Sequence, residues 1–318
     1  MIEIAGFSMV LTRRCNVSCR HCGFECNDAT SETMTRDEAM EYIGGAASIP
    51  SLRIVSFTGG EPFLEYDLLR DLVVLAGRMG ISSEVVTNGS WAATEAGARK
   101  RLEPLARQGL VNFVTSLDDF HLEQIPVENI GNAVKAAAEL GLNVTVKTTV
   151  SPGYPPSPAD PGRLLKLDPS RKNVRCVSVP LVPVGRAKRA PGQTPGGGPR
   201  LPRKALGGRC DKVIRFPTVF PGGAVFPCCG FGEGARLAGV AGEIPFPELL
   251  CRLCGNLSFN LLGVLGPQEI WEAIRGRFPT LPDRAFSSPC EQCNFLYLDP
   301  DALGAFDRWM GSLITPIS

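Results

Sequence analysis

Residues 15–22 read Cys-Asn-Val-Ser-Cys-Arg-His-Cys and come just after the short apolar run 6–11, which predicts a strand. The stretch puts the thiols of Cys15, Cys19 and Cys22 within eight residues. Soft ligands this close together are typical of an iron–sulfur cluster, whose irons are held by cysteine thiolates. A closed cluster takes four protein ligands and this loop offers three. We therefore expect a metal centre with one coordination position left open, as in a catalytic site.

Other interpretations of this loop are compatible with its residues. A zinc knuckle uses the same type of ligand, and three thiols can also fall together by chance. Cys26, four residues beyond Cys22, is a further thiol that could compete as a ligand. The loops that follow the other predicted strands help to decide between these interpretations.

The bulk composition indicates an ordinary globular chain. Its 318 residues are 44% hydrophobic and 20% charged, which allows one large domain and a smaller one. Lys and Arg number 33 against 32 Asp and Glu, so the net charge of +1 predicts neither nucleic acid nor a membrane surface as a partner. Twelve cysteines without a secretion signal favour metal ligands in a reducing cytoplasm over disulfides.

From residue 7 to about residue 187 the chain alternates strand-like and helix-like segments, which predicts an α/β fold with a parallel sheet. A capping box, in which Thr35 and Glu38 satisfy open backbone amides, predicts the start of the first helix. Lys147 lies inside one predicted strand and could face either the interior or solvent. After the first strand we expect strands at 53–57, 83–86, 111–115, 143–150 and 174–184, and helices at 35–48 and 127–140.

Glycine-rich or polar loops follow several of these strands. Residues 58–62 read Thr-Gly-Gly-Glu-Pro, whose glycines allow the backbone to approach a ligand and whose amides can bind an anion. Residues 87–89 read Thr-Asn-Gly, and residues 116–121 read Ser-Leu-Asp-Asp-Phe-His. In a barrel of parallel strands the active site lies at the carboxyl ends of the strands, where these loops begin. Each loop is also compatible with a plain turn, and His121 with a solvated side chain.

The cysteine spacing, followed by Gly-Gly-Glu-Pro after the second strand, resembles the radical S-adenosylmethionine (radical SAM) superfamily. The resemblance implies a partial (β/α)6 TIM-like barrel over residues 7–187. It also implies that Cys15, Cys19 and Cys22 hold a [4Fe–4S] cluster, and that SAM chelates the fourth iron. One electron then cleaves SAM to methionine and a 5′-deoxyadenosyl radical, which abstracts a hydrogen atom from the substrate. The residues expected to contact SAM are His21, Gly59, Gly60, Glu61 (facing the amino group), Pro62, Asn88, Ser116, Asp118, and Gly185 and Arg186 in a P-x-G-R-A segment.

A proline- and glycine-rich stretch at 190–199 divides the chain. We expect a radical SAM core at 1–188, a linker or flap at 189–204, and a small α+β cysteine-rich domain at 205–318. A hairpin glycine followed by Cys228 resembles the twitch and SPASM modules, which carry an auxiliary [4Fe–4S] cluster. That resemblance implies the ligand set Cys210, Cys228, Cys290 and Cys293.

Alternatives for the second half stay open. Cys229 could replace Cys228, and Cys251 and Cys254 could join Cys290 and Cys293 in a zinc site, because two C-x2-C units form a common zinc set. If the auxiliary set is as the resemblance implies, Cys251 and Cys254 are spare. A thiol held over the substrate can return a hydrogen atom to a carbon radical, so we assign these two cysteines the catalytic role of hydrogen donor. The other interpretation is that they are buried apolar side chains.

Family members with an auxiliary cluster modify peptides or carbohydrates. The first cysteine at residue 15 leaves no room for an N-terminal leader-binding module, and Asp118-Asp119 would suit a cationic aminosugar. The leading hypothesis is an enzyme of antibiotic biosynthesis, similar to neomycin-type epimerases, that epimerises or dehydrogenates an aminoglycoside-like carbohydrate. Flavodoxin or ferredoxin is the expected electron donor. The alternatives are a maturase that forms thioether, carbon–carbon or epimerised products in a ribosomal peptide, and an iron–sulfur electron carrier.

Overall fold

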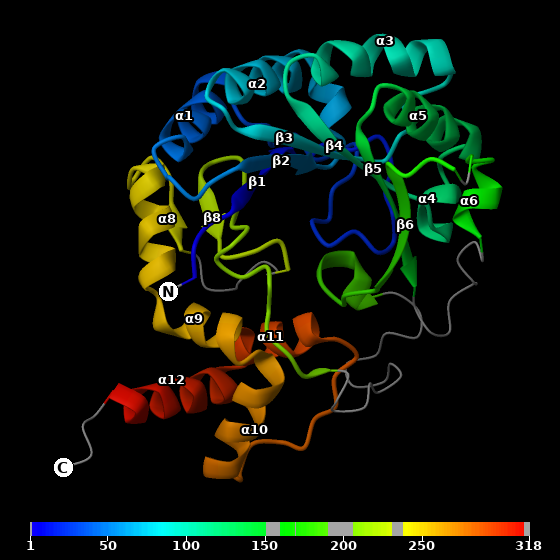
Figure 1. The fold of residues 1–318 in the computed structure, drawn as a ribbon. Helices are drawn as coiled ribbons and strands as arrows, with labels where there is room; N and C mark the ends of the chain where they lie inside the picture. Colours follow the sequence, from blue (N-terminus) through cyan, green and yellow to red (C-terminus); the bar gives the residue numbers. More distant parts are fainter. Residues whose placement is uncertain (1, 151–159, 169, 190–205, 231–237, 315–318) are drawn as a thin grey trace.

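The computed structural model (Figure 1) describes residues 2–150, 160–168, 170–189, 206–230 and 238–314. In these ranges one sheet has nine strands in the order β6-β5-β4-β3-β2-β1-β7-β8-β9. The first six strands in the sequence pair in parallel. They form an open, partial TIM-like barrel, which confirms the predicted fold class. Their bounds are β1 Gly6–Thr12, β2 Ile54–Gly59, β3 Ser82–Thr87, β4 Leu110–Ser116, β5 Asn143–Val150 and β6 Val174–Pro180.

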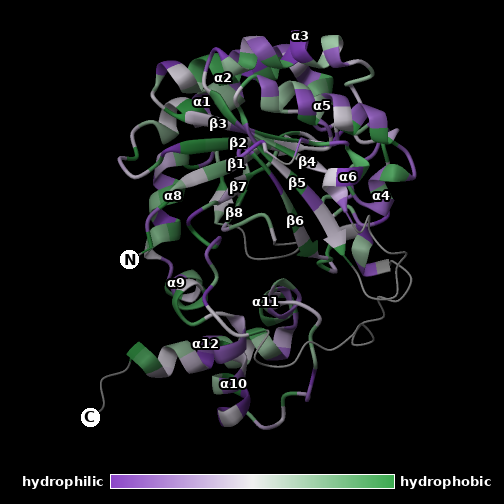
Figure 2. Ribbon diagram, turned by 45° about the vertical axis from the view of Figure 1, so that its right-hand side comes forward, coloured by the Kyte–Doolittle hydropathy of each residue, from purple (hydrophilic) through white to green (hydrophobic). Residues whose placement is uncertain are grey.

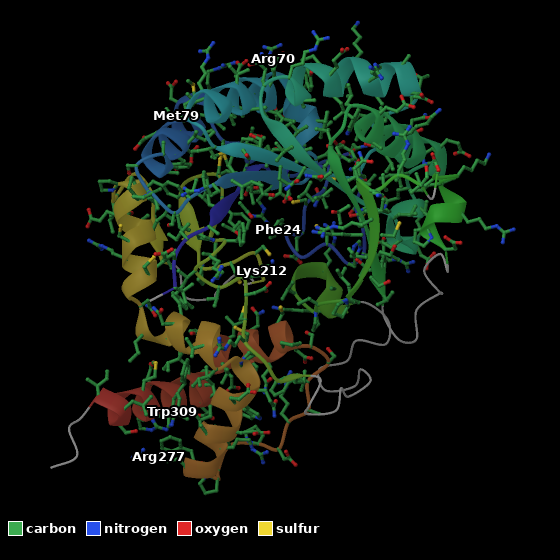
Figure 3. The ribbon with its side chains drawn as sticks, viewed as in Figure 1. Phe24, Arg70, Met79, Lys212, Arg277 and Trp309 are labelled. Atoms are coloured by element: carbon green, nitrogen blue, oxygen red, sulfur yellow. The ribbon has the colours of Figure 1, made fainter. Side chains whose placement is uncertain are left out.

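Helices cover the outer face of the barrel strands (Figure 1). Figure 2 shows hydrophobic residues along β1 and β2 and many hydrophilic residues on α3, as expected when a sheet is buried beneath a helical layer. Figure 3 shows Arg70 and Met79 on the outer side of this layer. The helices are α1 Arg36–Ala46, α2 Tyr66–Arg78, α3 Glu95–Ala106 and α5 Val127–Glu139, with the one-turn helices α4 Asp119–Leu122 and α6 Pro161–Leu164.

Local sequence explains where several of these elements begin and end. Thr35 and Glu38 form the predicted capping box, so α1 begins where the sequence indicated. β5 has the predicted bounds. β6 ends at Pro180, earlier than the predicted residue 184, and prolines at 180 and 183 lack the amide that would continue the ladder.

Strand register decides which side chains face the barrel interior. Ser116 on β4 pairs with Lys147 on β5, and Lys147 pairs with Val177 on β6. Paired residues of neighbouring strands point to the same face of a sheet. Ser116 lines the interior cavity described below, so the half-buried Lys147 also faces the interior.

The second half of the chain extends the sheet and then becomes helical. β7 Thr218–Val219 pairs in parallel with β1, and β8 Ala224–Phe226 and β9 Gly239–Val240 add antiparallel strands. Phe246, at the start of α8, packs against Phe7 of β1 and Tyr42 of α1 with ring centroids 5.3 and 5.0 Å away. The remaining helices are α8 Phe246–Gly255, α9 Leu257–Val264, α10 Pro267–Arg277, α11 Pro289–Leu298 and α12 Pro300–Ile314.

The predicted linker at 189–204 lies outside the described residues apart from residue 189, where the 3₁₀ helix η2 Gly185–Arg189 ends. The division into a core and a second domain therefore stays a prediction. None of the helices in the described ranges combines the length and the apolarity needed to cross a membrane.

Candidate active site

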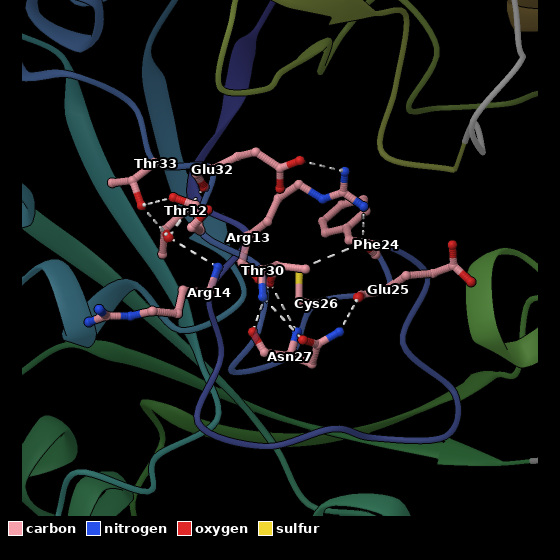
Figure 4. A network of polar contacts seen from close by, with 11 residues as sticks. Thr12, Arg13, Arg14, Phe24, Glu25, Cys26, Asn27, Thr30, Glu32 and Thr33 are labelled. Atoms are coloured by element: carbon pink, nitrogen blue, oxygen red, sulfur yellow. Dashed lines mark hydrogen bonds and ion pairs between the residues drawn. The ribbon is translucent and has the colours of Figure 1, made fainter.

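The cysteine loop leaves β1 at Thr12 and is held by polar contacts of its own residues (Figure 4). The hydroxyl of Thr12 lies 2.7 Å from that of Thr33, which joins the two ends of the loop. The guanidinium of Arg13 donates to the carbonyl of Phe24 at 3.0 Å, and the amide of Cys15 donates to the carbonyl of Asn27 at 3.0 Å. The loop backbone is thus fixed around its cysteines by contacts within the chain.

A cavity of about 230 Å³ opens at the carboxyl ends of the barrel strands. Cys15, Cys19 and Cys22 all line it, so the predicted ligands converge on one space. Such a set of three thiols fits a cluster that keeps one iron for another ligand. The predicted SAM contacts that also line the cavity are His21, Gly59, Gly60, Asn88, Ser116 and Arg186.

The predicted contact Glu61 has a different immediate role. Its side chain is 1% exposed, and its carboxylate accepts hydrogen bonds from the amides of Phe63 and Asn88, at 2.9 and 2.8 Å, and from the Thr87 hydroxyl at 2.8 Å. Burial raises the pKa of Glu61 to about 7, against the lowering effect of these donors. Glu61 therefore connects the loop after β2 to the end of β3, and it is not among the residues that line the cavity. Pro62 does not line the cavity either, because it is buried at the start of the 3₁₀ helix η1 Pro62–Glu65.

Gly59 and Gly60 bring the loop after β2 against the cysteine loop. A Cβ atom at either position would overlap a backbone carbonyl, that of Thr12 or that of Arg14. Gly59 also has φ +148°, which side chains rarely adopt. The sequence predicted backbone approach to a ligand here, and the structure shows backbone approach to another loop of the protein.

Asn88 and Arg186 both hold the cysteine loop. The Asn88 amide donates to the side-chain oxygen of Asn16 at 3.1 Å and lies 3.7 Å from the sulfur of Cys15. The Arg186 guanidinium donates to the carbonyls of Cys19 and Cys26 at 2.9 and 2.6 Å. The P-x-G-R-A segment is therefore a brace for the loop.

Gly185 allows this brace to come close. Its φ is +54°, and a Cβ there would overlap the carbonyl oxygens of Cys22 and Gly23. Gly185 itself is not among the residues that line the cavity. A direct contact between Gly185 and a ligand remains a prediction.

Asp118 lies behind the cavity wall and holds both histidines of the chain. One carboxylate oxygen is 2.7 Å from Nδ1 of His121, and the other is 3.9 Å from Nε2 of His21. Burial opposes the charge on His121, but Asp118 and Cys19 outweigh it and raise the pKa of His121 to about 10. Burial lowers the pKa of His21 to about 4. Asp118 is 1% exposed, so its negative charge acts on the two histidines within the protein.

The predicted auxiliary cysteines gather in the second half of the chain. Cys290 and Cys293 lie on α11, and a Cβ built on Gly230 would be 3.5 Å from the sulfur of Cys290 and 3.7 Å from that of Cys228. Burial, and then the neighbouring thiols, among them Cys210, raise the pKa of both Cys228 and Cys293. These four thiols fit a closed iron–sulfur site.

A fifth thiol, that of Cys229, adjoins this group from the side of the barrel. The Cys229 side chain is exposed to solvent. The protein atoms around it raise the pKa of its thiol, whereas the positive charges of Lys147 and Lys212 lower it. Figure 3 shows Lys212 between the sheet and the C-terminal helices. The charge of Lys147, which faces the barrel interior, therefore acts on Cys229 as well.

Cys251 and Cys254 do not reach either group. Both lie on α8, and the groups that influence the Cys254 thiol are Glu3, Ile4 and Cys251. Glu3 and Ile4 precede β1, whereas the cysteine loop follows it, and a strand of seven residues separates its ends by roughly 20 Å. The assignment of these cysteines as hydrogen donors is therefore corrected. The alternative zinc site formed by both cysteine pairs is not supported either. Cys254 on α8 is influenced by Glu3 and Ile4, whereas Cys293 on α11 is influenced by Cys290 and Cys210.

Some residues of the cavity were missed or undervalued in the sequence. Thr58, Thr87 and Cys26 line it, as does His121. The signal for the threonines was their place at the ends of β2 and β3. The sequence marked Cys26 as a possible competing ligand and His121 as part of the loop after β4, but it did not place either side chain in the cavity.

Comparison with known proteins agrees with this geometry. Residues 9–161 match the profile described as the Radical SAM superfamily. A candidate peptide biosynthesis protein, YydG of Bacillus subtilis (strain 168), is 24% identical over 186 residues, which cover 57% of this chain and 56% of YydG. The chain thus matches little more than half of that relative. The GTP 3′,8-cyclase of Moorella thermoacetica is 25% identical over 295 residues, 85% of this chain and 82% of the cyclase.

A solved structure shares the fold. Streptococcus suis SuiB bound to the precursor peptide SuiA superposes with a TM-score of 0.57 at 14% identity, covering 78% of this chain and 64% of SuiB. At this identity the likeness concerns the fold alone.

Proposed function

The chain is a radical SAM protein, by the domain that residues 9–161 form, and on this premise we propose that it cleaves S-adenosylmethionine reductively and removes a hydrogen atom from its substrate. The observation that carries the proposal is the single cavity lined by Cys15, Cys19 and Cys22 together with the loops that follow β2, β3 and β4. Three thiols suit a [4Fe–4S] cluster with an open iron. When bound, the cluster supplies the electron that splits SAM into methionine and the hydrogen-abstracting radical.

The polar side chains of the cavity suit the methionine end of SAM. Ser116 offers a hydrogen-bonding hydroxyl and is paired in register with Lys147. Among the described residues no carboxylate forms an ion pair with Lys147, which leaves its ammonium group available for a ligand. We assign Lys147 to the SAM carboxylate, a contact that the sequence did not predict.

The set Cys210, Cys228, Cys290 and Cys293 would hold an auxiliary cluster, which suits it to accept an electron in a dehydrogenation. Cys229 offers the other outcome. A thiol on the barrel side can return a hydrogen atom to a substrate carbon, which gives an epimer. The thiyl radical left on the sulfur would then regain one electron from the reductant and one proton from solvent. We propose Cys229 as this donor, in place of Cys251 and Cys254.

For the substrate we propose a peptide. The relative YydG is named for peptide biosynthesis, and its match covers 57% of this chain. One argument for an aminoglycoside-like carbohydrate was the charge of Asp118-Asp119, and the buried Asp118 uses its charge on His121 and His21. The carbohydrate is the second candidate and enters the same experiment.

The experiment incubates the reconstituted enzyme, without oxygen, with dithionite and SAM in D₂O. One arm contains a short precursor peptide encoded beside the gene, and the other contains a panel of aminosugars. Epimerisation through Cys229 predicts one deuterium in the product, because the thiol exchanges with solvent. The Cys229→Ala variant should still form 5′-deoxyadenosine but no deuterated epimer, while the control Cys254→Ala should behave as wild type. Turnover of aminosugars but not of the peptide would refute the substrate assignment.

A further inference from the structure

The Asp118 carboxylate faces one ring nitrogen of each histidine. Its Oδ1 atom is 2.7 Å from Nδ1 of His121 and also accepts a hydrogen bond from the His121 amide at 3.1 Å. Its Oδ2 atom is 3.9 Å from Nε2 of His21 and accepts from the amide of Thr149 at 3.4 Å. The carboxylate is thereby fixed in orientation. It orients the His121 ring through the 2.7 Å contact and attracts the Nε2 side of His21 by its charge.

The other ring nitrogen of each histidine is left for a different partner. With Nδ1 of His121 directed to Asp118, Nε2 is the free atom; with Nε2 of His21 facing Asp118, Nδ1 is the free atom. His21 Nδ1 is buried and has no hydrogen-bond partner among the described residues. The ligand atoms of Cys19, His21 and His121 all lie within 4.8 Å of one another.

This arrangement has the features of a zinc site. Zinc is bound by cysteine sulfur and histidine nitrogen in tetrahedral geometry, and three protein ligands leave one position for water. Histidines that bind a metal almost always donate their other ring N–H to a carboxylate or carbonyl. Here one buried carboxylate faces both histidines. Stacking of His21 on Phe120, with centroids 4.3 Å apart, further restricts the His21 ring.

We propose that the cluster-free chain binds one Zn²⁺ through Cys19, His21 and His121, with Asp118 orienting the two rings. Cys19 is also a predicted cluster ligand, and one thiolate cannot serve both metals in their own geometries. Zinc at this site therefore blocks loading of the iron–sulfur cluster. The inference concerns the chain before cofactor assembly, and it holds or fails independently of the reaction.

The test uses cluster-free protein and ZnCl₂ alone, with affinity measured against a chromogenic chelator. The auxiliary thiols are removed from competition by a Cys290→Ser, Cys293→Ser background. We expect one bound Zn²⁺ per chain, loss of that site in His121→Ala, and an affinity 10–100-fold lower in Asp118→Asn. Cys15→Ser is the matched control within the loop and should leave zinc affinity unchanged.

Two further readouts guard against misfolding and misassignment. His21→Phe keeps an aromatic ring for Phe120 but offers no ligand, so it should lose zinc while its circular dichroism matches that of wild type. Cobalt(II) in place of zinc should give the weak sulfur charge-transfer band of a single thiolate. Retention of zinc in His121→Ala, loss of zinc in Cys15→Ser, or a band of three thiolates would overturn the proposal.

Discussion

Arg186 carries the most direct test of how the cysteine loop is held. Its guanidinium reaches the carbonyls of Cys19 and Cys26 at 2.9 and 2.6 Å, and its own amide donates to Cys22 at 3.1 Å. Arg186→Met keeps the length of the side chain and the backbone bond but removes both guanidinium bonds. The change thus isolates two charged hydrogen bonds between η2 and the loop.

The expected cost follows from these two bonds. A hydrogen bond with a charged partner contributes roughly 1.5–3 kcal/mol, and the partial exposure of Arg186 favours the lower value for each. We expect the free energy of unfolding of the cluster-free protein to fall by about 3 kcal/mol, which is about a hundredfold in the folding equilibrium. With the cluster loaded, the same variant should lose iron to a chelator faster than wild type.

The assay is urea unfolding of the cluster-free protein, read from the midpoint at constant slope. Arg107→Met is the control, because the Arg107 side chain is 74% exposed and, in the part of the chain that the structure describes, forms its ion pair with Glu103 one helical turn away. Such a surface pair contributes about 0.5 kcal/mol. Differences between such variants are measured to within about 0.5 kcal/mol. If the free energies of unfolding of Arg186→Met and Arg107→Met agree within that error, Arg186 does not hold the cysteine loop as we describe.

Three further predictions concern other parts of the site. Gly185→Ala should destabilise the cluster-free protein by about 2 kcal/mol in the same urea assay, because it strains the backbone and overlaps the loop; unchanged stability would contradict this packing. Burial raises the pKa of Glu61 from 4.5 to about 7, so the folded state binds this proton more tightly. The free energy of unfolding should then fall by about 3 kcal/mol as pH rises from 4.5 to 7, a fall that Glu61→Gln should abolish. Cys293→Ser should lose about half of the iron bound after reconstitution, whereas Cys254→Ala should keep it all, and equal iron contents would refute the auxiliary set.

Much of the barrel could be predicted from the sequence because local patterns determine it. β5 has its predicted bounds, and the capping box of Thr35 and Glu38 starts α1 where expected. The strands β7 and β8 were not predicted as extensions of the sheet, since two or three residues are too few to show a period. Their place depends on pairing with β1, which is a contact between distant parts of the chain.

The sequence predicted the part of the site whose residues lie within one loop. It did not predict the parts that depend on which way a side chain points in the folded chain. The cysteine spacing alone indicated three converging ligands. Lys147 could not be assigned to a face until its register with Ser116 was known. Glu61 points into the protein because three backbone or hydroxyl donors surround it, and only the folded chain brings them together.

The positions of Cys251 and Cys254 could not be predicted either, because they depend on where the whole helix α8 packs. Their spacing resembles a ligand pair, but packing of Phe246 on Phe7 and Tyr42 holds α8 at the opposite end of β1 from the cavity. Burial of such aromatic rings contributes several kcal/mol and outweighs any preference of the thiols. No local pattern in α8 indicates which surface of the barrel it will cover.

The central claim is the reductive cleavage of SAM at the cavity of Cys15, Cys19 and Cys22. The protein, reconstituted without oxygen, is mixed with dithionite and SAM, and 5′-deoxyadenosine is measured by mass spectrometry. We predict that it forms with wild type and with Cys254→Ala, and that Cys19→Ala abolishes it. Absence of 5′-deoxyadenosine from wild-type protein with iron loaded at both sites and each candidate substrate present would contradict the account.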